Sequence, residues 1–186
     1  WCVMEYLDTI TRAKNRSHIT DVAKQLFQVH GITETTVKDI VKYAKIERKT
    51  FYNYFSDKEE IAHYIYYQIM EEFYSVGFTS DDYVDCENGF SKIRLYFNTL
   101  IDTMIELKEE MEFVSKYYYY FFPEINEDFL LDIYEDYEVQ EPVLMFEEGI
   151  DDGSIKLLSG YPIEIFHMMD QSIKQYAYSI FIADDE

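Results

Sequence analysis

Residues 35–58, TTVKDIVKYAKIERKTFYNYFSDK, contain two apolar patterns at helical spacing with only a few residues between them. The apolar positions of the first pattern are Val37, Ile40, Val41 and Ala44. Thr36 precedes this pattern and Asp39 follows three residues later, which is the pairing of a capping box and marks where a helix begins. The stretch therefore predicts two short helices joined by a tight turn.

The second pattern separates apolar residues from cationic and hydrogen-bonding ones. The positions that can face inward are Ile46, Phe51, Tyr52 and Phe55, and those that can face outward are Arg48, Lys49, Thr50, Asn53 and Tyr54. Arginine and lysine can pair with guanine N7 and O6, asparagine with adenine N6 and N7, and hydroxyl groups can reach phosphates. This outward set favours a helix that reads the DNA major groove. A solvated amphipathic helix with scattered charges is the alternative.

A longer pattern runs without a gap from Ile19 to Ile61 and ends in the signature YNYFSDKE at residues 52–59. Its earlier members are Ile19, Ala23, Leu26, Phe27, Gly31, Thr35, Thr36, Val37, Ile40, Ala44, Ile46, Thr50 and Phe51. This pattern resembles the DNA-binding part of the TetR (tetracycline-repressor-like) family of bacterial regulators. The resemblance implies a helix-turn-helix whose second helix reads DNA.

The resemblance also implies which residues contact DNA. They are Thr36, Lys45, Arg48, Lys49, Thr50, Tyr52, Asn53, Tyr54 and Lys58. Of these, Thr36, Tyr52 and Lys58 would anchor phosphates, and Arg48, Lys49, Thr50 and Asn53 would face bases. A homodimer on a palindromic double-stranded DNA operator would present two such helices about 34–36 Å apart, or a multiple of that distance.

Three positions depart from the family pattern. Lys45 replaces the turn glycine, so we expect an unusual backbone angle or a reshaped turn there. Glu47 replaces the serine that caps the recognition helix, and a glutamate caps less well although its charge suits a helix N-terminus. Lys49 replaces a small residue. These changes affect the fine geometry of recognition rather than the motif.

The net charge of −21 is unevenly distributed. Residues 1–60 contain ten Lys/Arg and nine Asp/Glu, net +1, whereas residues 61–186 contain six and twenty-eight, net −22. Within residues 35–58 the balance is six to three, net +3. Because exposed charges farther apart than about 8 Å are largely screened at physiological salt, the local balance is compatible with DNA binding.

Long apolar stripes and only 6 glycines and 3 prolines in 186 residues predict an all-α fold. We expect an N-terminal three-helix helix-turn-helix domain over residues 1–57 and a C-terminal helical effector-binding and dimerisation domain over residues 58–186. Helices are expected over residues 58–78 and 89–111, the first opened by Asp57 with Glu60, and a last helix from Pro162.

Residues 113–122, FVSKYYYYFF, are unusually aromatic, and four successive tyrosines on a helix point to four sides. One interpretation is an effector pocket for a small molecule that is lipophilic or cationic; ordinary aromatic packing is the other. The candidate pocket residues are Tyr67, Met70, Phe97, Met104, Tyr117, Tyr118, Phe121 and Tyr134.

The family commonly dimerises through its last long helices, and intrachain packing is the alternative for the same residues here. The candidate dimerisation residues are Phe146, Phe166, Met169, Ile173, Tyr176 and Ile180.

No catalytic or metal-binding spacing is found in the sequence: the four histidines are dispersed and there is no HExxH, Cys/His cluster or phosphate loop. We therefore expect no enzyme and no cofactor. Without an apolar run of about 18 residues or a leader, we expect no membrane segment and a cytoplasmic protein. The leading hypothesis is a ligand-responsive TetR-type transcriptional regulator, most simply a repressor. The alternative is a helical dimer that binds a small molecule or a protein and has lost specific DNA binding.

Overall fold

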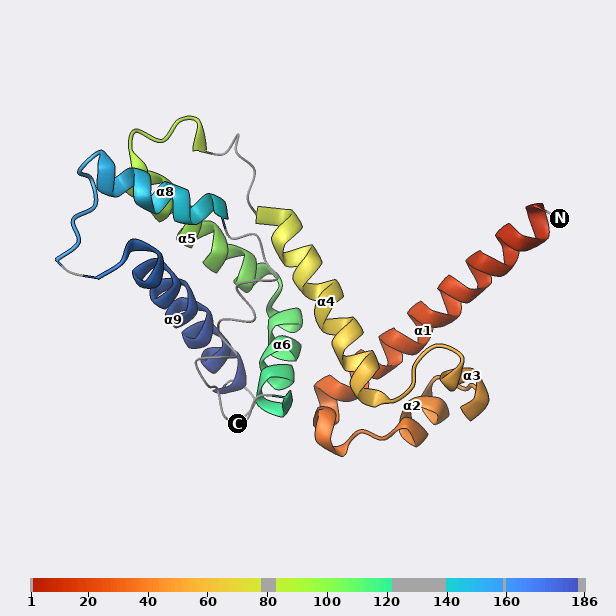
Figure 1. The fold of residues 1–186 in the computed structure, drawn as a ribbon. Helices are drawn as coiled ribbons and strands as arrows, with labels where there is room; N and C mark the ends of the chain where they lie inside the picture. Colours follow the sequence, from red (N-terminus) through yellow and green to blue (C-terminus); the bar gives the residue numbers. More distant parts are fainter. Residues whose placement is uncertain (1, 78–82, 122–139, 159, 184–186) are drawn as a thin grey trace. The chain divides into compact units, whose positions relative to one another are not determined.

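The computed structural model describes residues 2–77, 83–121, 140–158 and 160–183. In these ranges the regular elements are all α-helices, and a short helical turn lies near Tyr83. The all-α prediction is therefore confirmed. The helices fall into two compact units (Figure 1). The first unit comprises Trp1–Met70 and Glu112–Phe121, and the second comprises Glu71–Met111 and Phe122–Glu186. The domain boundary at residue 57 stays a prediction.

The first unit contains α1 (Cys2–Glu34), α2 (Val37–Tyr43), α3 (Arg48–Tyr52), the first part of α4 (Lys58–Gly77) and the last part of α6 (Lys108–Phe121) (Figure 1). Its fully buried side chains come from α1 to α4 and from the loop between α3 and α4, and include Ile19, Phe27, Ile40, Phe51, Phe55, Ile61 and Ile65. These are the apolar positions of the helical stripes, so the hydrophobic effect accounts for the three-helix core.

Two lysines bind the carbonyl groups at the C-terminal end of α1. The helix has a break at Gly31, whose φ of 77° is open to glycine without strain. Nζ of Lys58, from the start of α4, donates to the carbonyls of Ile32 at 2.7 Å and Thr33 at 3.0 Å. Nζ of Lys116, from α6, donates to the carbonyl of Gln28 at 2.8 Å. Since the last carbonyls of a helix have no intrahelical partner, these cations satisfy and stabilise that end.

The second unit contains α5 (Gly89–Glu106), α8 (Gln140–Asp151) and α9 (Pro162–Ala183), with α5 and α8 side by side (Figure 1). The core of this unit is formed by Tyr83, Ile93, Tyr96, Met145, Phe146 and Phe166. The prediction of one helix over residues 89–111 is wrong, because Leu107 leaves the helical conformation at φ −96° and ψ 35°, and α6 begins at Lys108. The last helix starts at Pro162 as predicted.

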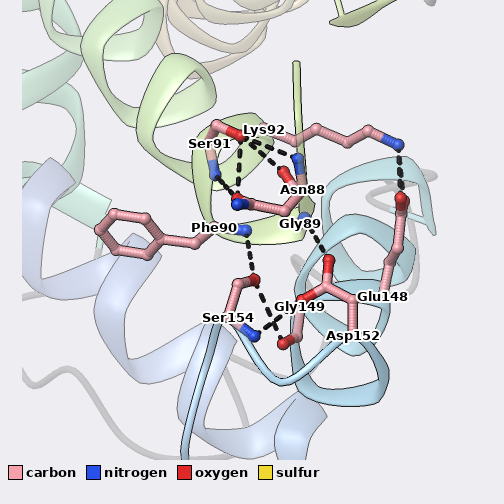
Figure 2. Close-up of polar contacts among 9 residues, drawn as sticks. All are labelled: Asn88, Gly89, Phe90, Ser91, Lys92, Glu148, Gly149, Asp152 and Ser154. Atoms are coloured by element: carbon pink, nitrogen blue, oxygen red, sulfur yellow. Dashed lines mark hydrogen bonds and ion pairs between the residues drawn. The ribbon is translucent and has the colours of Figure 1, made fainter.

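The N-terminus of α5 is held from two directions (Figure 2). Asn88 and Ser91 form a capping box within the helix, and Oδ2 of Asp152, just past α8, accepts from Gly89 N at 2.8 Å. Lys92 forms an ion pair with Glu148 of α8 at 2.6 Å (Figure 2). A Cβ on Gly89 would lie 2.1 Å from the backbone nitrogen of Gly149, so only glycine permits this approach of α5 and α8.

Candidate nucleic-acid interface

The capping box predicted at the start of α2 is present. Asp39 N donates to Oγ1 of Thr36 at 3.2 Å, and Thr36 N donates to Oδ2 of Asp39 at 3.1 Å. The hydrogen bonds from the Thr36 side chain and backbone hold the pKa of the Asp39 carboxyl below its usual value of 3.8. Thr36 is exposed, so the helix start carries a hydroxyl at the surface.

The turn between α2 and α3 is a Schellman motif with a lysine at the glycine position. Lys45 N donates to the carbonyl of Lys42 at 3.3 Å, and Ile46 N donates to the carbonyl of Val41 at 3.2 Å. Lys45 adopts φ 54°, the one positive φ of a non-glycine residue in the described ranges. The unusual angle expected at Lys45 is therefore present, and the turn keeps its hydrogen bonds at the cost of backbone strain.

The second helix of the motif, α3, has only five residues. Its N-cap residue Glu47 makes no side-chain capping hydrogen bond. Phe51 and Phe55 are buried, as the apolar pattern predicts. Tyr52 is 46 % exposed, which disagrees with the inward position allowed by its apolar pattern and is compatible with the DNA contact that the resemblance implies. It lies four residues after Arg48 and three after Lys49, and this helical spacing brings it to their side.

The outward set lies on one accessible surface of the first unit. Arg48, Lys49 and Asn53 are exposed, Thr50 and Tyr54 are half-buried, and Lys45 is exposed in the preceding turn. Nη2 of Arg48 donates to the hydroxyl of Tyr52 at 3.2 Å, and the guanidinium lies 5.6 Å from that ring. The surface thus presents cations, an amide and hydroxyls, which can pair with phosphates and base edges.

Lys58 is predicted to contact DNA, but its ammonium group already binds groups within the protein. It donates to the two α1 carbonyls described above and lies 5.4 Å from the ring centroid of Tyr120. The residue is half-buried. Its role as a phosphate anchor stays a prediction, whereas its capping of α1 is visible in the structure.

Side chains of α1 and of the loop after it form hydrogen bonds that support the two-helix motif. Nε2 of His18 donates to the carbonyl of Ala44 at 3.1 Å, which ties α1 to the turn. Oγ1 of the buried Thr35 bonds to the carbonyls of Gly31 at 2.7 Å and Leu26 at 3.3 Å. Nδ2 of Asn15 donates to the hydroxyl of Tyr54 at 3.2 Å. The sequence pattern did not reveal these contacts, since they join residues far apart in the chain.

The start of α4 carries the predicted pair of carboxylates. Oδ1 of Asp57 accepts from Glu60 N at 2.7 Å, and Oε2 of Glu60 accepts from Ser56 N at 2.6 Å. The hydrogen bonds from Ser56 lower the pKa of the Glu60 carboxyl, and the charge of Arg16 contributes in the same direction. The helix that follows the recognition helix is therefore capped at its N-terminus.

The family model for bacterial regulatory proteins of the tetR family matches residues 19–65, which are the residues of this motif and its supports. This segment is therefore similar to the DNA-binding part of TetR-family regulators. Among curated relatives, the TetR-family segment is 42 % identical over 48 residues to the dhaKLM operon transcriptional activator DhaS of Lactococcus lactis, covering 26 % of this chain and 26 % of that protein. The chain matches about a quarter of the length of its curated relatives.

Solved TetR-family structures share the fold over nearly the whole chain. A candidate TetR-family regulator from Syntrophomonas wolfei is 20 % identical with a TM-score of 0.59, covering 94 % of this chain and 86 % of that one. The fatty acid degradation regulator FadR from Bacillus halodurans is 15 % identical with a TM-score of 0.63, covering 92 % and 86 %. The matched segment and the overall fold are thus both found in transcriptional regulators.

The predicted effector residues fall into both units. Tyr67, Met70, Tyr117, Tyr118 and Phe121 belong to the first unit, Phe97 and Met104 belong to the second, and Tyr134 lies outside the described residues. A hollow of about 420 Å³ in the second unit is lined by residues such as Tyr83, Leu144 and Met145, and by none of the seven candidates that the structure describes. The effector site therefore stays a prediction.

The tyrosine run packs on α4 within the first unit. The Tyr117 ring stacks on Tyr66 at 4.2 Å, and its hydroxyl lies 2.6 Å from Nδ1 of His63. The hydroxyls of Tyr66 and Tyr118 are 2.8 Å apart, and Phe121 stacks on His63 at 4.3 Å. This part of α6 is thus joined to α4 by ring contacts and hydrogen bonds together.

The predicted dimerisation residues divide by exposure. Phe146 and Phe166 are buried in the core of the second unit, so their side chains pack within the chain itself. Ile173 is half-buried, whereas Met169, Tyr176 and Ile180 on α9 are exposed, Tyr176 by 70 %. The exposed three are the ones that a second copy could cover, and the dimer interface stays a prediction.

The described ranges contain no group of three or more His, Cys, Asp and Glu side chains that could hold a metal ion. None of the described helices combines the length and the apolar character needed to cross a membrane.

Proposed function

We propose that this protein is a DNA-binding transcriptional regulator that acts as a homodimer on a palindromic operator, most simply as a repressor. The observation that carries the proposal is the exposed face of α3, where Arg48, Lys49 and Asn53 surround a helix anchored by the buried Phe51 and Phe55. The local net charge of +3 over residues 35–58 supports contact with phosphates despite the acidic remainder of the chain. Acting on DNA, the protein would be cytoplasmic.

Two features support dimerisation: the short recognition helix and the exposed apolar residues of α9. A recognition helix of five residues offers few base contacts, so two copies on adjacent half-sites are required for high specificity. The exposed Met169, Tyr176 and Ile180 give α9 an apolar surface that a second copy would cover. The acidic charge of the chain would suppress non-specific binding to DNA and leave the α3 contacts to decide affinity.

We further propose that a small effector, lipophilic or cationic, binds among the helices that follow Lys58 and lowers DNA affinity. Both α4 and α6 contain residues of the first unit and residues of the second, so each helix is a covalent path between the two. An effector that favours one arrangement of these helices shifts the DNA-binding equilibrium by its difference in affinity for the two states. DhaS is named an activator, so a reporter fusion would decide the sign of regulation.

The proposal is tested by selecting duplexes from a random pool and measuring their affinity at several salt concentrations. We expect steep salt dependence for all duplexes and a selected palindrome bound at least about 10³-fold more tightly than random DNA. Arg48→Ala and Asn53→Ala should each cost about 1–3 kcal/mol of discrimination at one operator position.

Arg94→Ala is the matched control, since Arg94 is an exposed arginine of α5 in the second unit. Its truncation should leave discrimination between operator and random DNA unchanged. If no duplex is bound more tightly than random DNA, the alternative of a helical dimer without specific DNA binding replaces the proposal.

A further inference from the structure

A cation from α1 lies against aromatic rings behind the recognition helix. The guanidinium carbon of Arg16 is 4.0 Å from the ring centroid of Tyr64 and 5.3 Å from that of Phe55. Tyr64 belongs to α4, and Phe55 lies in the loop between α3 and α4, three residues after α3 ends. A single side chain of α1 therefore contacts both this loop and the helix after it, at distances where cation–π attraction acts.

The rings beneath Arg16 continue toward the exposed face of α3. Phe55 packs against Tyr64 at 5.8 Å and against Phe51 at 6.0 Å, and Phe51 meets Tyr52 edge to face at 5.5 Å. Phe51 and Phe55 are buried, whereas Tyr52 is exposed beside Arg48. The row of rings thus connects Arg16 to the side chains proposed to meet DNA.

The recognition helix depends on such support because it has little stability of its own. Five residues form barely more than one turn, and helices this short do not persist in water without tertiary packing. The absence of a side-chain cap from Glu47 removes another local stabilising contact. Its orientation must therefore be set by the buried rings and by whatever fixes those rings.

The guanidinium of Arg16 lies against two rings, and its charge also acts on the Glu60 carboxyl. Nε of Arg16 is buried and has no hydrogen-bond partner in the described part of the chain. Burying an unpaired donor is unfavourable, so the contacts of the guanidinium with the two rings must offset that cost. The side chain also lines a hollow of about 740 Å³ with Arg12 and Tyr54, which makes a direct phosphate contact the competing role.

We propose that Arg16 is a positioning residue, which orients α3 for sequence-specific reading by holding Phe55 and Tyr64 and does not itself contact DNA. For its DNA consequence, this inference rests on the proposed function. Losing the cation would let the ring row and α3 reorient, so base contacts would weaken while the number of phosphate contacts would not change. Replacing Arg16 should therefore reduce the discrimination between operator and random DNA and leave the salt dependence of binding unchanged.

The test compares Arg16→Met, Arg16→Lys and Arg12→Met in the full chain, using the selected operator and a random duplex. We expect Arg16→Met to weaken operator binding roughly tenfold, with little change for random DNA and an unchanged slope of log K against log salt. Arg16→Lys should fall between, because lysine keeps the charge but not the planar group. A slope reduced by about 0.9, with both duplexes weakened equally, would indicate a phosphate contact and overturn the proposal.

Hydrogen exchange without DNA separates this inference from the proposed function. We expect faster amide exchange over residues 47–57 in Arg16→Met and unchanged exchange in Arg12→Met, while circular dichroism shows both variants folded. Unchanged exchange in Arg16→Met would refute the positioning role even if the protein binds its operator. Faster exchange in a protein that selects no operator would support the positioning of α3 and refute the proposed function instead.

Discussion

The N-termini of α3 and α5 are built in opposite ways. The five-residue α3 starts at Glu47 without a side-chain cap and is held by rings and by residues of α1. The 18-residue α5 starts with its own capping box and receives a further hydrogen bond from Asp152 (Figure 2). The comparison teaches that α5 is stabilised at its own N-terminus, whereas α3 leaves its outer side chains exposed and takes its stability from neighbouring elements.

The largest effect is expected where α5 meets α8. Gly89→Ala would place a Cβ 2.1 Å from Gly149 N and 2.7 Å from the carbonyl oxygen of Met145, so the two helices must separate. We expect a loss of about 3 kcal/mol or more in the free energy of unfolding, measured by urea titration. Gly149→Ala is the comparison: its nearest contacts are side-chain atoms of Ile155, which can move, so it should cost less. Equal stability of both variants and the unchanged protein would contradict the close approach.

The next effect concerns the cation that caps α1. Lys58→Met keeps much of the side-chain length but leaves the carbonyls of Ile32 and Thr33 without this donor. We expect a loss of about 1–3 kcal/mol in unfolding free energy, measured by thermal or urea denaturation. Lys49→Met, a change at an exposed lysine of α3, should leave stability nearly unchanged and reduce the salt slope of DNA binding instead. A reduced slope without lost stability in Lys58→Met would make Lys58 a phosphate anchor rather than a cap.

Stability and DNA affinity should move in opposite directions at the turn before α3. Lys45→Gly removes the strain of φ 54° and should raise the unfolding free energy by about 1 kcal/mol. The same change removes a cation from the proposed DNA surface and should weaken binding. Lys45→Met separates the two effects, since it removes the charge but keeps a side chain at this angle; it should weaken DNA binding without a gain in stability. A loss of stability in the glycine variant would show that the turn is not strained.

The smallest effects are expected in the pH dependence of stability. Asp39 probes the first unit and Asp152 probes the second. Hydrogen bonds from Thr36 lower the pKa of Asp39, and those from Gly89 and Ser154 lower the pKa of Asp152, both from 3.8. A lowered folded pKa adds stability above the unfolded pKa, and this contribution is lost as pH falls through the folded value. Asp39→Asn and Asp152→Asn should therefore be less stable than the unchanged protein at pH 7, and the difference should shrink as the pH falls below 3.8 through the lowered pKa values of the folded protein.

Urea midpoints at pH 7 and at acid pH measure this difference in stability. Asp21→Asn is the control, at an exposed carboxylate of α1. A difference that persists unchanged at low pH would mean that the carboxylate charge is not the cause. Asp39→Asn should act on the first unit and Asp152→Asn on the second, which probes specific to each unit can distinguish.

The features predicted correctly from the sequence are those set by neighbours in the chain. The Thr36–Asp39 capping box, the pairing of Asp57 with Glu60 and the positive φ of Lys45 each involve residues within four positions. Tyr52 was misplaced because it was assigned to an inward stripe, although one face of so short a helix cannot bury every aromatic residue. The helix break at Leu107 gave no signal in the sequence, since no proline or glycine marks it.

By itself, the sequence determined the all-α class, the two-helix motif and the types of side chain on its outer face, because helical periodicity and capping are local properties. Only the tertiary structure decided that Lys58 and Lys116 cap α1, that Arg16 lies on the rings of Phe55 and Tyr64, and that Phe166 is buried within the chain. These contacts join residues tens of positions apart, and their partners are chosen by how helices pack rather than by spacing along the chain.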